Sequence, residues 1–164
     1  WALLIGIDQY DKQPLKGCVN DVELMKEYLI KNFKVPMHHI GSLCDKSATR
    51  DNIIHALLGF RTDEHINPND IIIIYFAGHG SNYTCEKHLD HTTKNPDSRL
   101  GCCPVEMICP VDRGRDTADP LSTFSKIPDI SDRELNVILK EISKAKGNRI
   151  TLIIDCCHAG GVGR

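Results

Sequence analysis

The sequence has neither a membrane-spanning segment nor a nucleic-acid-binding stripe. No apolar run among its 164 residues approaches the roughly 18 to 20 residues that a bilayer span needs. Basic and acidic residues are interleaved and the formal net charge is −2, which argues against a nucleic-acid partner. Internal repeats and low-complexity tracts are also missing. We therefore expect a globular domain with no membrane or nucleic-acid partner.

A signal peptide is missing as well, and the eight cysteines do not indicate a secreted disulfide scaffold. Several of them lie in or beside strand and helix patterns, and a core of this size needs no covalent staples. We expect free thiols and a cytoplasmic location. The chain opens at Trp1 almost directly in an apolar strand and stops at Arg164 just after its most reactive stretch. We therefore expect it to be part of a longer protein, whose targeting segment could lie outside this sequence.

The sequence does contain an alternation of strand and helix patterns, which we interpret as one domain over residues 1–164. The four consecutive isoleucines of the third strand pattern suit a strand buried on both faces, as in a parallel sheet. Strands joined by right-handed helical crossovers give a parallel sheet with helices on both faces, so the fold class is α/β. The predicted strands are residues 1–7, 39–43, 70–76 and 150–154.

Three helices are predicted between these strands. The first, residues 19–33, carries apolar residues at helical spacing. The second, residues 49–63, begins at a threonine that is a suitable N-cap. The third, residues 131–147, opens with the capping box Ser-Asp-Arg-Glu and ends at a glycine.

Between residues 81 and 128 the apolar residues follow neither a helix nor a strand period, apart from an apolar island at 105–111. A loop this long inside a compact domain is usually functional. It contains residues of the zinc-ligand type, in the patterns Cys85-x-x-His88-x-x-His91 and Cys102-Cys103. Their spacing matches no zinc template, so we predict a polar loop and no metal site.

Two of the predicted strands end in reactive residues. The strand at 150–154 leads into Asp155-Cys-Cys-His-Ala-Gly160, and the strand at 70–76 leads into Ala77-Gly-His-Gly80. Parallel sheets place their chemistry at the carboxyl ends of the strands, so neighbouring strands would bring a thiol and an imidazole together. An imidazole that removes the thiol proton makes a nucleophile. The glycines let the backbone turn sharply, and the N–H of Gly80 can face an oxyanion.

The same residues have plainer interpretations. Cys156 and Cys157 could be inert thiols at a strand end, and His79 a turn residue. That interpretation suits either segment alone, whereas their joint occurrence favours a Cys–His site. A redox or metal-sensing thiol protein is a third hypothesis, which ranks last because adjacent cysteines rarely form a strain-free disulfide.

These segments resemble the metacaspases, in the caspase-like clan of cysteine peptidases. The likeness rests first on Phe76-Ala-Gly-His-Gly80 and Asp155-Cys-Cys-His-Ala-Gly160, which resemble the two catalytic motifs. Leu15-Lys-Gly-Cys-Val-Asn-Asp21 and Ile108-Cys-Pro-Val-Asp112 are similar to two further family segments, and Ile127-Pro-Asp129 fits the fungal branch. The motifs come in the family's order and span nearly the whole chain. The resemblance implies a caspase-like three-layer sandwich with a mainly parallel sheet.

The resemblance also implies the catalytic roles. The nucleophile is Cys157, which directly precedes His-Ala-Gly, rather than Cys156. The base is His79, and the oxyanion hole is formed by the backbone amides of Gly80 and Cys157.

The resemblance further implies a substrate preference. Asp21 and Asp155 match the buried acids with which the family reads Arg or Lys on the amino side of the scissile bond. A carboxylate pair inside a cleft favours a cation and repels an acidic side chain. Asp21 could instead be a first-turn acid that interacts with the helix dipole.

The implied function is a cysteine endopeptidase that cleaves after Arg or Lys through a thioester, with protein or peptide substrates that carry basic residues. The alternative is a catalytically weak caspase-like scaffold or signalling module. The family's fold continues with a small-subunit region, so we expect this catalytic half to pack with its own small-subunit strands. Without them, its last strand would be an open edge.

Many metacaspases are activated by calcium, held by a run of aspartates after the catalytic histidine. Here the acids of that loop are spread out and mixed with basic residues, whereas calcium needs several convergent oxygens. No cofactor is therefore firmly indicated, and Ca²⁺ activation stays an expectation from the resemblance. The acids are Glu86, Asp90, Asp97 and Glu106.

Overall fold

The computed structural model describes residues 1–84, 104–118 and 124–156. The main body consists of β1 (Ala2–Gly6), α1 (Cys18–Phe33), β2 (Ile40–Cys44), α2 (Arg50–Thr62), β3 (Ile72–Ala77), α3 (Asp132–Lys146) and β7 (Ile150–Asp155). Two short 3-10 helices flank β2, η1 (Met37–His39) and η2 (Asp45–Ser47).

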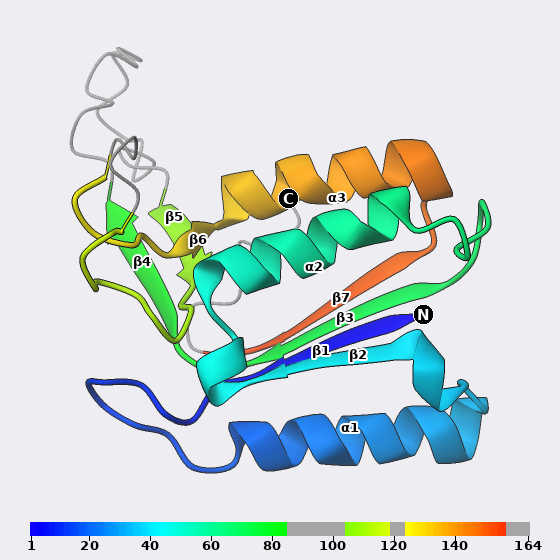
Figure 1. Cartoon of the computed structure of the whole chain (residues 1–164), viewed down its shortest axis with the longest axis horizontal. Coiled ribbons are helices and arrows are strands. Elements are labelled where there is room, and N and C mark those ends of the chain that lie inside the picture. The colour runs from blue at the N-terminus through cyan, green and yellow to red at the C-terminus, as the bar shows by residue number, and fades with distance from the viewer. Residues whose placement is uncertain (85–103, 119–123, 157–164) are drawn as a thin grey trace, which may run out of the picture.

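These elements form three layers (Figure 1). The four strands make one parallel sheet in the order β2-β1-β3-β7. α1 covers one face of this sheet, while α2 and α3 lie side by side on the other. The predicted α/β architecture is therefore confirmed. No helix of the described residues is long and apolar enough to cross a bilayer.

β1 and β3 are the central strands, and their side chains build a core on both faces. On the α1 side, Leu4 of β1 packs in a cluster with Val22 and Leu29 of α1. On the opposite side, Ile5 packs in a cluster with Ile53 of α2. A fully buried Leu or Ile contributes about 1.5–3 kcal/mol relative to an exposed one. Burial on both faces explains why these strands are continuous apolar runs rather than alternating ones.

β7 differs from the other predicted strands because it lies at the edge of the described sheet. Its residues alternate between exposed and half-buried, and Ile153 is 37% exposed. The prediction of a buried strand at 150–154 is therefore wrong, because no described segment packs beyond β7. The expectation that the last strand forms an open edge is confirmed.

A second, antiparallel sheet lies beyond the carboxyl ends of β3 and β7 (Figure 1). It consists of β4 (Gly80–Thr84), β5 (Pro104–Ile108) and β6 (Ile130–Ser131). The prediction of a loop from residue 81 onward is therefore wrong for β4, whereas most of β5 coincides with the apolar island at 105–111, to which we assigned no strand. These strands are short and polar in part, and they form through pairing between distant residues rather than through a local pattern.

The predicted N-caps at Thr49 and Ser131 are confirmed, whereas the side chain of Glu134, the second half of the predicted capping box, pairs with Arg50. The hydroxyl of Thr49 accepts a hydrogen bond from the N–H of Asn52 at 3.3 Å, and the hydroxyl of Ser131 accepts one from Glu134 at 3.2 Å. The first N–H groups of a helix have no partner within the helix, so such side chains stabilise its start. α3 ends at Gly147, whose φ is +92°.

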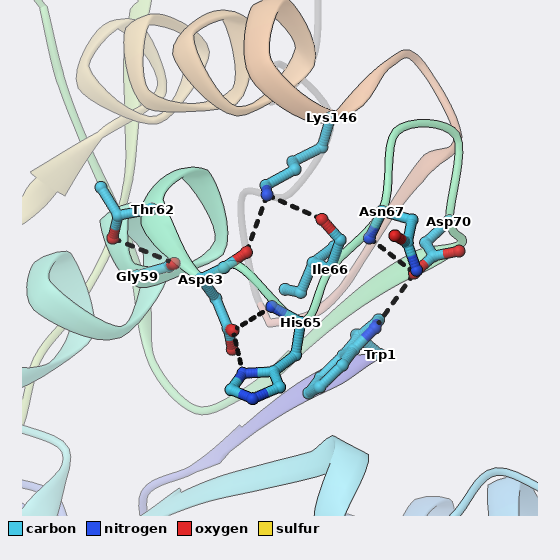
Figure 2. Close-up of polar contacts among 9 residues, drawn as sticks. All are labelled: Trp1, Gly59, Thr62, Asp63, His65, Ile66, Asn67, Asp70 and Lys146. Atoms are coloured by element: carbon cyan, nitrogen blue, oxygen red, sulfur yellow. Dashed lines mark hydrogen bonds and ion pairs between the residues drawn. The ribbon is translucent and has the colours of Figure 1, made fainter.

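Lys146 is the one charged residue of the described ranges that is buried when backbone and side chain are taken together, with 9% of its surface exposed. Its ammonium donates to the carbonyl oxygens of Asp63 and Ile66, both at 2.7 Å (Figure 2). These residues directly follow α2, so the cation lies at the negative end of that helix. Lys146 therefore ties the end of α3 to the end of α2.

We predict that Lys146→Met lowers the free energy of unfolding by about 2 kcal/mol, because two carbonyl groups lose their donor while the apolar stem is retained. Urea unfolding measures this difference. The matched control is Lys144→Met on the same helical turn, whose side chain is 73% exposed and pairs with Glu141. We expect that control to change stability by less than about 0.5 kcal/mol. Equal effects of the two substitutions would contradict the role of Lys146.

Candidate active site

The register of β3 and β7 brings two predicted segments to the same edge of the sheet. Ala77 pairs with Asp155, and the ladder continues from the N–H of Gly78 to the carbonyl of Asp155 at 3.3 Å. Gly78 and Cys156 each come one residue after this last pair, and His79 follows Gly78. The expected neighbourhood of the two strand ends is confirmed. The predicted nucleophile, Cys157, lies outside the described residues.

The imidazole of His79 contacts the loop between β1 and α1. Its Nε2 lies 2.7 Å from the carbonyl oxygen of Gln13. Because a carbonyl only accepts, Nε2 must carry the hydrogen in this contact, and Nδ1 of the neutral ring is left as the acceptor. Gln13 has a φ of +56°, a left-handed conformation that is uncommon for a residue with a side chain. The loop thus aims a backbone carbonyl at the ring.

The backbone of His79 is held by Tyr10, from the same loop. The Tyr10 hydroxyl accepts from the N–H of His79 and donates to the carbonyl of Cys109, both at 2.9 Å. The two rings lie 4.6 Å apart between centroids. Tyr10 is 5% exposed, and its burial raises the pKa of the phenol well above its usual range.

The position of Tyr10 explains why residue 78 is a glycine. A β-carbon added at residue 78 would lie 2.6 Å from the Tyr10 hydroxyl oxygen and 2.9 Å from the Phe76 ring. We predicted that this glycine allows a sharp turn, and the structure shows that it provides space for the tyrosine.

The strand after His79 is held by its pairing with β5 and by Asp129. The Cys109 N–H donates to the carbonyl of His79 at 3.0 Å, which makes Gly80 and Ile108 a non-hydrogen-bonded pair. In such a pair the Gly80 N–H faces away from β5. The next residue, Ser81, donates its hydroxyl to Asp129 at 2.7 Å.

Asp129 is in turn held by Arg113. The guanidinium donates two hydrogen bonds to the carboxylate, at 2.7 and 2.6 Å. The side chain of Asp129 is only 8% exposed, and hydrogen bonding to it raises the pKa of Arg113. This pair fixes the start of β4.

Asp21 and Asp155 line one cavity of about 410 Å³ beside the strand ends. The Tyr75 hydroxyl donates to Asp155 at 3.4 Å. Burial raises the pKa of Tyr75 to about 12, and the negative charges of Asp155 and Asp21 add to that rise. The other lining residues are Leu24, Met25 and Tyr28 of α1.

The alternative role of Asp21, as a first-turn acid that interacts with the helix dipole, is compatible with the structure, because Asp21 lies in the first turn of α1. The N–H groups at the start of α1 are satisfied by Asp8, whose two carboxylate oxygens accept from Cys18 and Val19 at 3.0 and 3.2 Å. Asp21 thus lines the cavity and lies at the start of the helix. The expectation that both acids are buried is wrong, because Asp155 is exposed and Asp21 half-buried. The open edge at β7 accounts for this exposure.

The structure shows three contributors that the sequence interpretation missed. Gln13 acts through its backbone carbonyl, which no side-chain pattern reveals. Tyr10 lies between the first predicted strand and the first predicted helix, in a segment to which we assigned no role. Asp129 belongs to a motif that carried the family resemblance without an assigned role.

Metal ligation finds no support among the described residues, where no three His, Cys, Asp or Glu side chains are grouped to hold an ion. The zinc-type residues and three of the four scattered acids of the loop lie outside the described residues. The fourth acid, Glu106, lies on β5.

We predict that Cys18 reacts slowly with alkylating reagents. Burial and the nearby carboxylate of Asp8 raise the pKa of this thiol to about 11, with further contributions from Asp21 and Asp155. A pKa about two units above the usual value leaves about a hundredfold less thiolate at pH 8. Iodoacetamide labelling followed by mass spectrometry from pH 7 to 10 measures this reactivity.

Asp21→Asn removes one of the charges that raise this pKa, so Cys18 should then react faster at each pH. Glu23→Gln, on the same helix but outside the cavity, is the control and should leave the rate unchanged. An unchanged rate in Asp21→Asn would contradict the closeness of Asp21 to this thiol.

Comparison with known proteins agrees with this architecture. Residues 1–163 match the family model described as metacaspase, peptidase C14 domain. Metacaspase-1B of Neurospora crassa is 31% identical over 166 residues, covering 97% of this chain and 33% of that protein. Metacaspase-1 of Botryotinia fuckeliana is also 31% identical, covering 97% of this chain and 34% of that protein. The chain thus spans about a third of the length of these curated relatives.

A solved structure shows the same fold. The crystal structure of protein GSU0716 from Geobacter sulfurreducens superposes with a TM-score of 0.62 at 23% identity, covering 98% of this chain and 51% of that one. That likeness concerns the fold alone. The match of the family model to nearly every residue, together with these relatives, shows that the chain belongs to the metacaspase family of C14 peptidases.

Proposed function

We propose that the protein containing this chain is a cysteine endopeptidase, with Cys157 as nucleophile and His79 as base. The observation that supports this most is the register of β3 and β7, which pairs Ala77, two residues before His79, with Asp155, two residues before Cys157. A strand-end thiol beside a strand-end imidazole is the arrangement that nucleophilic catalysis needs. Function is argued here from the site rather than from the fold.

In the proposed reaction, Nδ1 of His79 takes the proton of Cys157 and the thiolate attacks the carbonyl carbon of the scissile bond. The carbonyl of Gln13 accepts from Nε2–H, keeps Nδ1 available and stabilises the ring once it is protonated. The oxyanion of the tetrahedral intermediate is held by the amides of Gly80 and Cys157. His79 then protonates the leaving amine, and water hydrolyses the resulting thioester.

The proposed specificity is for Arg or Lys on the amino side of the scissile bond. The cavity that Asp21 and Asp155 line supports this preference, because two carboxylates attract a cation. Leu24 and Met25 give the same cavity an apolar wall, against which the aliphatic stem of a basic side chain can pack.

We further propose that the open edge at β7 is covered by the small-subunit region of the same protein. An exposed edge strand offers unpaired backbone groups to another strand, and the 37% exposure of Ile153 supports a covering partner. The free thiols at Cys18, Cys44 and Cys109 support a reducing, cytoplasmic location.

The dyad is tested by labelling the full-length protein with an arginine-containing peptidyl electrophile, with and without Ca²⁺. We expect the label on Cys157, and its loss in His79→Ala, because the thiol then lacks its base. Peptide mapping by mass spectrometry locates the label. A label on Cys156 would overturn the choice of nucleophile, and no label in either condition would favour the scaffold function.

The basic preference is tested by Asp21→Asn. We expect kcat/KM for an arginine substrate to fall about a hundredfold, because one of two charges that face the cation is lost. Glu23→Gln is the matched control, since Glu23 lies on the same helix, is exposed and pairs with Lys26. If both variants keep the activity of the natural protein, the cavity does not recognise the positive charge of the substrate.

A further inference from the structure

We propose that Tyr10 is a positioning residue, which holds His79 in place for the reaction through its backbone. This inference rests on the proposed function, because it assigns a role relative to the Cys–His site. It concerns a residue that touches neither the scissile bond nor the nucleophile, and whose hydroxyl acts on the peptide that carries the base.

Three hydrogen bonds form a closed circuit around this hydroxyl. The N–H of His79 donates to the Tyr10 oxygen, and the Tyr10 hydroxyl donates to the carbonyl of Cys109. The N–H of Cys109 donates back to the carbonyl of His79. Both polar groups of the His79 backbone are thereby satisfied by groups that are themselves fixed, one by burial and the other at the end of β5.

The surroundings leave the hydroxyl no alternative position. Tyr10 is 5% exposed, and the absence of a side chain at Gly78 is what allows its oxygen to approach. Its one hydrogen is used by Cys109, so the phenol is not available to protonate a substrate. The geometry therefore suits a fixed support better than an acid or a base.

The same loop contacts His79 a second time, at the ring. The carbonyl of Gln13 lies on Nε2, and the loop is tied down between these contacts by Asp11, whose carboxylate accepts two hydrogen bonds from Arg115 at 2.8 Å. Tyr10 and Gln13 thus hold the backbone and the ring of His79 from one rigid segment. A shift of the histidine backbone would move Nδ1 away from the thiol, and a misplacement of about 1 Å can cost about a hundredfold in rate.

Tyr10→Phe tests this role, because it removes the hydroxyl and keeps the ring. In the full-length protein we expect the maximal rate of Cys157 labelling by the arginine-containing electrophile to fall by about tenfold or more. The half-saturating concentration of the reagent should stay within about twofold, because the cavity of Asp21 and Asp155 is untouched. The two constants are separated by measuring labelling rates over a range of reagent concentrations.

A purely structural role would lower stability without this selective loss. Lys146→Met is the control, since it removes the hydrogen bonds to Asp63 and Ile66, which precede β3, whereas His79 follows that strand. Below the melting temperature of both variants, we expect Lys146→Met to keep the natural maximal labelling rate. An equal loss of rate in the two variants, or an unchanged rate in Tyr10→Phe, would overturn the proposal.

Amide hydrogen exchange supplies a readout that needs no variant. In the natural protein, the His79 N–H should exchange about as slowly as the ladder amides of β3, because the Tyr10 oxygen accepts from it. Rapid exchange at His79 beside protected β3 amides would overturn the proposal. A natural protein that the electrophile does not label would overturn the proposed function and this inference together, whereas a labelled protein with an unaffected Tyr10→Phe variant would overturn this inference alone.

Discussion

The hydrogen-bond register between β3 and β7 is the constraint on which the rest of the site depends. Because the strands are parallel and Ala77 pairs with Asp155, the segments that follow β3 and β7 leave the sheet at the same edge. A slip of one residue would turn every side chain of β7 to the opposite face. It would also move Asp155 out of the cavity that it lines with Asp21. On β7, Ile150, Leu152 and Ile154 pack against the core cluster on the side of α2 and α3, and this packing specifies the register.

Backbone groups provide most of the support around His79. A carbonyl at Gln13 contacts the ring, and an N–H at Cys109 contacts the peptide. The Tyr10 hydroxyl bridges the N–H of His79 and the carbonyl of Cys109. Such a site needs irregular segments that are rigid, and rigidity here comes from paired charges and buried hydroxyls rather than from regular structure. At α1, similarly, Asp8 accepts hydrogen bonds from the first N–H groups of the helix, while Asp21 lines the cavity.

The sequence predicts those parts of the structure that depend on local patterns. The caps at Thr49 and Ser131 are local and are confirmed. The isoleucine run is confirmed from Ile72 onward, whereas Ile71 precedes β3 and is exposed. β4 was missed, and β5 was recognised only as an apolar island, because their pairing joins residues that are far apart in sequence. The exposure of β7 was missed because an apolar strand pattern does not reveal how many neighbours the strand has. The contact of a backbone carbonyl such as that of Gln13 cannot be predicted from a sequence, because every residue has this group.

The exposure of β7 also bears on how strongly the acid cavity can select a cation. Two unit charges 4 Å apart attract by about 1 kcal/mol in bulk water, but by about 4 kcal/mol at an effective dielectric constant of about 20. Asp155 is exposed in residues 1–164, so water weakens its field. A segment that covers the β7 edge would exclude that water and strengthen the attraction without moving either carboxylate. The proposed selectivity for basic residues would therefore depend on the packing at this edge as much as on the two acids.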